Sequence, residues 1–213
     1  MPLYPGGLTA SDPLSLLDWK RHVFALYRDV RGSSEHEMAW SRWRAGRDEL
    51  FKDHPQSPLP AAAREAFAGL PYFDYDPAAR ILAALEPAEP RTYEIAASDG
   101  GAYSFTRFGT VGFEVDGEPG ELEAYWLEGY GGGIFLPFRD ATSGSETYGA
   151  GRYLLDTVKG ADLGTEDGQL ILDFNFAYNP SCSYDPRWAC PLAPAPNWLD
   201  AEVRAGERYV SMN

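Results

Sequence analysis

Lysine is almost absent from this chain. Its 213 residues include 15 arginines but only 3 lysines (Lys20, Lys52 and Lys159), and 32 acidic residues leave a formal net charge of −14. A surface this acidic repels nucleic-acid phosphates, which disfavours a nucleic-acid partner. Many acidic residues with few lysines are typical of proteins that stay hydrated in concentrated salt. We therefore expect a halophilic, salt-adapted protein; GC-rich codon usage, which also favours arginine over lysine, is the alternative.

Long apolar runs are missing as well. No stretch approaches the roughly 20 apolar residues that a membrane span needs. Residues 1–22 lack the basic start, apolar run and small-residue cleavage site of a secretory signal. We therefore expect a cytoplasmic protein without a membrane partner. The composition is still 44% hydrophobic and 14% aromatic, which is enough for a sizeable core and disfavours disorder.

Cysteine and histidine are scarce, and the common catalytic motifs are missing. The chain has 2 cysteines, Cys182 and Cys190, and 3 histidines that all lie far upstream. Two thiolates do not complete a zinc site, so no metal is predicted. Free thiols are the first interpretation of the pair, a disulfide the second and a metal contact the last. No nucleophile-elbow, Walker, dinucleotide-binding or zinc-protease motif indicates a cofactor, which stays unknown.

The first 70 residues have the pattern of helices. Asp12 and Pro13 suit a helix start, and Gly32 suits its end. The apolar residues between them recur at spacings of three and four: Leu16, Trp19, Val23, Leu26 and Val30. Ser34 and Glu37 match a capping box for a second helix, which the prolines of segment 54–60 end. Its apolar contacts are predicted at Met38, Trp43, Leu50 and Phe51, and a short helix is predicted over 61–67.

The rest of the chain predicts strands. Turn signals separate six strand-like segments over 91–97, 102–117, 120–129, 132–138, 151–160 and 170–180. We predict an α+β fold, with N-terminal helices packed on a mainly antiparallel β-barrel or β-sandwich. We expect a single domain over 1–213, with a helical part (1–70), an antiparallel β body (71–178) and a wrapping tail rich in proline and aromatics (179–213).

Segment 138–154, "FRDATSGSETYGAGRYL", concentrates polar groups between two apolar strands. Arg139 and Arg152 could form a fork for a carboxylate or a phosphate. The alternative is that both arginines pair with Asp140, Glu146 or Asp173 and lock the loop.

Segment 173–179, "DFNFAYN", has a period of two. This places Asp173, Asn175 and Asn179 on one strand face and the aromatic residues on the other. Asp and Asn are depleted in strands. The polar row therefore faces solvent, lines a pocket or forms a structural polar network.

Three functions are compatible with these residues. The leading hypothesis is a polar pocket beside the sheet that binds a small anionic ligand through Arg139, Arg152, Tyr153, Asp173, Asn175 and Tyr178. The second is a hydrolase with a carboxylate as general acid or base and a histidine as partner; its candidates are Asp140, Glu146, Asp173 and His54. The third is a structural or interaction protein whose polar network only locks the fold. The oligomeric state is not predicted.

Five segments in a fixed order resemble a known family. They are "HPQSPL" (His54–Leu59), "FAGLPYFDYD" (Phe67–Asp76), "PFRDATSGSETYGAGRYL" (Pro137–Leu154), "DFNFAYNPSCSYDP" (Asp173–Pro186) and "CPLAPAPNWL" (Cys190–Leu199). Together they resemble the "domain of unknown function sixteen-eighty-four" family of archaeal and bacterial proteins. The resemblance spans most of the chain and implies a single functional unit. It implies no activity and no catalytic residue.

Overall fold

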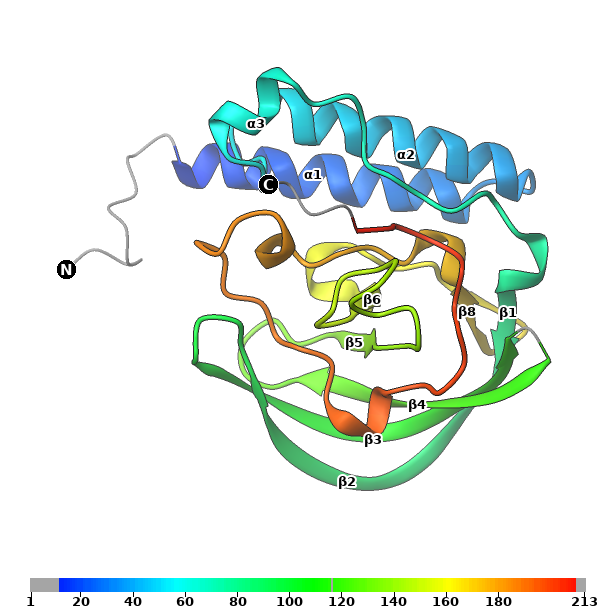
Figure 1. Ribbon diagram of the computed structural model, residues 1–213. Helices are drawn as coiled ribbons and strands as arrows, with labels where there is room; N and C mark the ends of the chain where they lie inside the picture. The colour runs from blue at the N-terminus through cyan, green and yellow to red at the C-terminus, as the bar shows by residue number, and fades with distance from the viewer. Residues whose placement is uncertain (1–11, 116, 210–213) are drawn as a thin grey trace.

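Helices form one layer of the molecule. The computed structural model describes residues 12–115 and 117–209, and it is drawn in Figure 1. The helices α1 (Asp12–Arg31), α2 (His36–Asp53) and α3 (Ala61–Glu65) lie above a strongly curved sheet (Figure 1). This arrangement confirms the predicted α+β class. No helix in the described part of the chain combines the length and the apolar character needed to cross a membrane.

The start of α2 differs from the prediction. Its N-cap residue is Glu35, whose side chain makes no capping hydrogen bond, so the predicted capping box does not form. The Glu35 amide instead donates to the Ser33 hydroxyl at 3.2 Å. Met38, expected to be buried, is 59% exposed. It lies on the side of the helix opposite the buried Trp40, because two residues turn an α-helix through more than half a revolution.

The strands form two antiparallel sheets. The larger has the order β2-β3-β4-β5-β6 and the smaller the order β1-β8-β7. The strands of the larger sheet are β2 (Leu85–Ala96), β3 (Ala102–Val115), β4 (Glu118–Leu127), β5 (Ile134–Phe138) and β6 (Arg152–Asp156). Those of the smaller sheet are β1 (Arg80–Ala83), β7 (Thr165–Glu166) and β8 (Gln169–Asp173).

The predicted barrel is wrong, because the larger sheet is open. β2 and β6 are its two edge strands and do not pair with each other. β2 carries Pro87 and Pro90, which have no N–H to donate, and its register with β3 shifts between Pro87 and Arg91. For this reason proline within sheets is favoured on edge strands and at bulges, and Pro137 of the inner strand β5 lies at a shift in register. The two sheets share one core instead, which leaves a sandwich-like arrangement as the surviving alternative.

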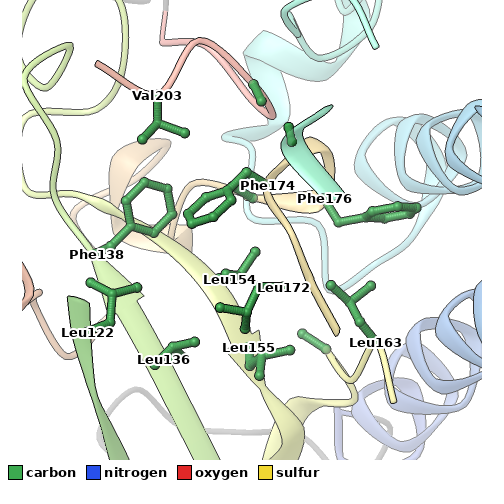
Figure 2. Close-up of a cluster of buried hydrophobic side chains, with 14 of the residues drawn as sticks. Leu122, Leu136, Phe138, Leu154, Leu155, Leu163, Leu172, Phe174, Phe176 and Val203 are labelled. Atoms are coloured by element: carbon green, nitrogen blue, oxygen red, sulfur yellow. The ribbon is translucent and has the colours of Figure 1, made fainter. Parts of the chain in front are cut away.

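The main core lies between the two sheets and the helices (Figure 2). Phe138 of β5 and Phe174, which follows β8, meet edge to face with their ring centroids 5.3 Å apart. Phe176 packs against Trp43 of α2 at 5.0 Å. Leucines of β4, β5, β6 and β8 fill the space below these rings (Figure 2). The core therefore joins the helical layer to both sheets.

The strand predicted over 170–180 ends early. β8 stops at Asp173, and Phe174–Phe176 form a 3-10 turn. The cause is local, since the Asp173 Oδ1 atom accepts the Asn175 amide at 3.0 Å and so turns the chain. The expectation of a row of polar side chains with a period of two over 173–179 is therefore wrong.

Residues 179–209 wrap around the body (Figure 1). This segment contains two short 3-10 turns, Ser181–Ser183 and Ala195–Asn197, and otherwise runs as an extended segment across the sheet and back toward the helices (Figure 1). Backbone hydrogen bonds fasten it to the body. The Leu199 amide donates to the Arg139 carbonyl at 2.7 Å, and the Glu207 amide donates to the Ala177 carbonyl at 2.8 Å.

Candidate functional site

Arg152, the most conspicuous cation of the polar loop, is completely buried. Its Nη2 donates to the Val203 carbonyl at 2.8 Å and to the Asp140 carboxylate at 3.3 Å, and its Nη1 donates to the Ala205 carbonyl. Burial lowers the pKa of Arg152, which Asp140 opposes. The guanidinium group therefore ties the C-terminal segment to the sheet and presents nothing to solvent.

Asp140 is the partner of Arg152 and is saturated in the same way. Its Oδ2 accepts the Thr142 hydroxyl at 2.6 Å and the Val203 amide at 2.9 Å. Its Oδ1 accepts from the Ser143 hydroxyl at 3.3 Å and faces Arg152. A carboxylate that accepts this many bonds is held in one orientation.

Glu207 extends this buried network and was not predicted from the sequence. It is fully buried, and its Oε2 accepts from Arg47 Nη2 at 2.8 Å and from the Asn179 amide at 3.1 Å. The Tyr184 hydroxyl donates to its Oε1. Burial raises the pKa of Glu207, and Arg47 is the main opposing influence. We call the set Arg47, Asp140, Arg152 and Glu207 the C-terminal lock.

Arg139 does not join Arg152 in a fork. Its guanidinium carbon lies 4.8 Å from the ring centroid of Trp198, which is itself 53% exposed. Glu146 also lies toward the surface, where its Oε1 accepts from Arg204 Nε at 3.0 Å. The structure therefore places the two arginines in separate environments, one in the lock and one against the tail.

The tyrosines predicted to bind a ligand are packed in the interior. Tyr153 is buried, and its hydroxyl donates to the Pro191 carbonyl. Its ring contacts Phe135 at 4.8 Å and Tyr178 at 5.7 Å. The guanidinium carbon of Arg47 lies 5.1 Å from the Tyr178 ring centroid. These contacts hold the tail against β6.

The side chains of Asp173 and Asn175 are hydrogen-bonded to each other and lie outside the polar loop of residues 138–154. The Asn175 side chain donates to Asp173 Oδ1 at 2.9 Å and to the Asp76 carbonyl at 2.7 Å. Both residues are buried, and Asp173 also lines a hollow of about 270 Å³ with His36, Arg80 and Glu166. Burial raises the pKa of Asp173 from 3.8 to about 6. We call this space the β8 hollow.

His54 is half of a hydrogen-bonded pair at the end of α2. Its Nδ1 accepts the Gln56 amide at 3.0 Å, so in the neutral ring Nε2 carries the proton. Nε2 lies 3.3 Å from Asp18 Oδ2, and His22 completes a cluster whose ligand-type atoms lie within 4.8 Å of one another. A histidine that binds a metal through one ring nitrogen donates the N–H of the other to an acceptor. Nδ1 of His54 accepts a hydrogen bond instead, so this arrangement favours a hydrogen-bonded cluster over a metal site. In this state neither nitrogen of His54 is free to act as a base.

An apolar cavity of about 380 Å³ opens between the first turns of α1 and the larger sheet. We call it the α1 cavity. Its wall includes Leu16, which is 42% exposed, and Phe105 and Phe135, which are buried. Tyr103 and Leu127 extend the sheet side. The remaining wall residues come from the α1 face, the segment after α2, the turn after β6 and the tail: Trp19, Lys20, Gln56, Pro58, Asp156, Val158, Lys159, Ser181, Trp188, Ala189, Cys190 and Pro191.

The charged groups of the α1 cavity differ from those of the rest of the chain, because lysines outnumber acidic residues in its wall. Two of the 3 lysines, Lys20 and Lys159, lie in its wall, and Asp156 is its one acidic residue. Lys159 Nζ lies 3.3 Å from Asp156 Oδ2, and its side chain remains 58% exposed. Loss of water around the ammonium lowers the pKa of Lys159, but the neighbouring Asp156 carboxylate more than offsets this, and the pKa is raised on balance. The wall therefore carries a local positive excess in a chain whose net charge is −14.

No pattern in the sequence indicates this cavity. Its residues come from α1, from the four strands β3 to β6, from the segments after α2 and β6 and from the tail, and most of them are ordinary apolar side chains. The scarcity of lysine was visible, but the meeting of Lys20 and Lys159 across 139 positions is a property of the fold.

Comparisons with known proteins identify a family and a similar structure but name no activity. A family model described as "Protein of unknown function (DUF1684)" matches residues 65–208. A solution NMR structure of an uncharacterized protein of Haloarcula marismortui is 35% identical, with a TM-score of 0.61 over 86% of this chain and 100% of that one. No curated protein matches.

Proposed function

We propose that in this member of the DUF1684 family of proteins of unknown function the α1 cavity binds a small anionic molecule with an apolar body. The family, which the sequence motifs predicted, names no activity, so the proposal is based on the geometry of the cavity. The observation that supports this most is the pair of lysines in a mostly apolar wall. Ligand sites are typically concave and mostly apolar, with a few polar groups that fix orientation.

The size and lining of the α1 cavity indicate the class of ligand. A volume of about 380 Å³ lies within the range of small-molecule sites. Aromatic and aliphatic side chains such as Trp19, Phe105 and Leu127 would bury an apolar body. Lys20 and Lys159, both in the wall, would attract its acidic group. A carboxylate or sulfonate on an aromatic or aliphatic body fits this combination.

The acidic surface does not argue against an anionic ligand. At physiological salt, exposed charges farther away than about 8 Å are largely screened. The two lysines act at contact distance, where screening is weakest, and Asp156 fixes the position of Lys159. The local charge of the wall therefore outweighs the distant negative surface.

Fluorescence titration with two probes tests this proposal. The first probe is 8-anilinonaphthalene-1-sulfonate, and the second is N-phenyl-1-naphthylamine, which keeps the aromatic body and lacks the sulfonate. Lys159→Met and Lys20→Met should each weaken binding of the sulfonate about tenfold, equivalent to about 1.4 kcal/mol. Both variants should bind the neutral probe unchanged.

Lys52 offers a matched control, because it is the third lysine of the chain and lies outside the cavity wall. Lys52→Met should bind both probes as the wild type does. Lys159→Met leaves Asp156 without its cation, so the double variant Asp156→Asn/Lys159→Met separates loss of binding from loss of stability. Equal loss of the sulfonate in Lys52→Met and Lys159→Met would overturn the proposal.

A specific observation favours hydrolase activity as the second candidate function. Asp173, in the β8 hollow, has a pKa raised to about 6 by burial, which suits a general acid near neutral pH. Both of its hydrogen bonds from Asn175 fall on Oδ1. A panel of p-nitrophenyl esters and glycosides would test this candidate. Activity that disappears in Asp173→Asn and follows a group titrating near pH 6 would support it.

A further inference from the structure

The two cysteines meet at the start of the tail. Cys182 lies in the Ser181–Ser183 turn, and its backbone amide donates to the Cys190 sulfur at 3.4 Å. Both are free thiols in the structure. The chain between them therefore forms a short loop whose two ends are already in contact.

The surroundings of the two sulfurs differ. The Cys182 sulfur lies beside the Cys190 thiol, which donates to it, and 3.9 Å from the Tyr148 hydroxyl. The bond from the Cys190 thiol is the largest influence that lowers the pKa of Cys182 from 9.0 to about 6. The same bond, together with burial, raises the pKa of Cys190. Cys182 is half-buried, whereas Cys190 is buried.

Ser98 fixes this arrangement to the sheet. Its hydroxyl accepts the Cys190 amide at 3.1 Å and donates to the Trp188 carbonyl at 2.9 Å. Its own amide donates to the Cys190 carbonyl at 3.0 Å. The position of the Cys190 backbone is thus set by the turn that follows β2, independently of the α1 cavity's contents.

We propose that Cys182 and Cys190 form a thiol–disulfide exchange site, in which Cys182 is the attacking thiol and Cys190 the resolving thiol. The arrangement matches the chemistry, because the two cysteines are in contact, the more exposed sulfur of Cys182 lies beside the Tyr148 hydroxyl, and the second thiol is shielded. A thiolate of this kind is the nucleophile in disulfide exchange. The co-reactant is a small-molecule disulfide.

The exchange balances in two steps. The Cys182 thiolate attacks one sulfur of the small disulfide, forms a mixed disulfide and releases the other half as a thiolate. Cys190 then loses its proton to solvent and attacks the Cys182 sulfur, which releases the second half. The two cysteines are oxidised by two electrons in total, and the small disulfide is reduced to two thiols.

Intact-mass analysis of the folded full-length chain tests the site, with glutathione disulfide as the probe. The reduced wild type should become lighter by two hydrogens and retain no glutathione. Cys190→Ser should stop at a glutathione adduct on Cys182, because the resolving thiol is missing. Cys182→Ser should react at least about tenfold more slowly, because its remaining thiol is buried and largely protonated.

Two results would overturn the proposal. One is a wild type that stays fully reduced under conditions in which free glutathione exchanges. The other is equal reactivity of Cys182→Ser and Cys190→Ser, which would mean that the two thiols are not differentiated. Circular dichroism of each variant ensures that the comparison is made on folded protein. Because lysine variants of the α1 cavity leave both sulfurs in place, failure of the ligand proposal would not affect this test.

Discussion

The C-terminal lock and the α1 cavity use charged residues in opposite ways. In the lock, Arg152 and Glu207 are completely buried, and their charged groups bind other parts of the chain. In the α1 cavity, Lys159 stays more than half exposed and most of the wall is apolar. The lock is dense in polar groups and closed, whereas the cavity has few polar groups and is open.

This difference teaches that a concentration of polar residues in the sequence is a poor guide to a binding site here. Burying a charge is costly unless partners replace its water. The polar loop therefore supplies many partners for a few buried charges, and little of it is left for a ligand. The cavity, by contrast, keeps its two lysines within reach of solvent and of any molecule that enters.

The largest expected effect comes from breaking the lock. Arg152→Ala should destabilise the fold by about 3–5 kcal/mol, because it leaves Asp140 buried without its cation. Arg139→Ala is the matched control and should cost about 1 kcal/mol or less, because its contact with exposed Trp198 is a surface cation–π interaction. Urea unfolding of both variants measures the difference. Equal losses would contradict the distinction between the two arginines.

The next effect concerns the pH dependence of stability. Asp173 has a folded-state pKa raised from 3.8 to about 6. Between these values the folded state binds more protons than the unfolded state, so this group lowers stability as the pH rises from about 4 to about 6. The amide of Asp173→Asn does not titrate, so the variant should not show this loss. Its free energy of unfolding relative to the wild type should therefore rise by up to about 3 kcal/mol between pH 3.5 and pH 7.

Urea unfolding at a series of pH values checks this prediction. The Asn side chain keeps the Oδ1 acceptor that Asn175 uses, so the local turn should survive. A difference between Asp173→Asn and the wild type that is the same at pH 3.5 and at pH 7 would show that the pKa is not raised.

The smallest expected effect is that of salt, which should change stability and ligand binding in opposite directions. Raising KCl from 0.1 M to 1 M shortens the Debye length from about 10 Å to about 3 Å. The free energy of unfolding should rise, because repulsion among the acidic surface groups is screened. Binding of the sulfonate probe should weaken over the same range, because Lys159 is exposed. Maximal stability at low ionic strength would contradict salt adaptation.

The sequence predicted the elements of the fold better than their closure. The spacing of Trp19, Val23 and Leu26 identified α1, since an amphipathic stripe is a local property. The predicted barrel was wrong because closure depends on which strands lie at the edges of a sheet. Pro87 and Pro90 mark β2 as an edge strand, but they do so only once β2 is known to begin at Leu85. Turn chemistry at Asp173 likewise overrode a pattern with a period of two.

The candidate site was less accessible to prediction. Asp140 was among the partners that the sequence offered for Arg152, but its other partners are main-chain carbonyls more than 50 positions away, and a carbonyl looks the same at every residue. The α1 cavity depends on where the tail crosses the sheet, which no local pattern encodes. The cysteine pair was the exception, because two cysteines in one short segment indicated their proximity before the fold was known.

The most direct test of this account is an NMR titration of the ¹⁵N-labelled chain with 8-anilinonaphthalene-1-sulfonate. If the α1 cavity is the binding site, amide shifts should change around residues 16–20, 103–105, 156–159 and 188–191, and the amides of Asp140 and Arg152 should stay in place. Shifts centred on 139–152, with none along α1, would place the site at the polar loop and contradict the account.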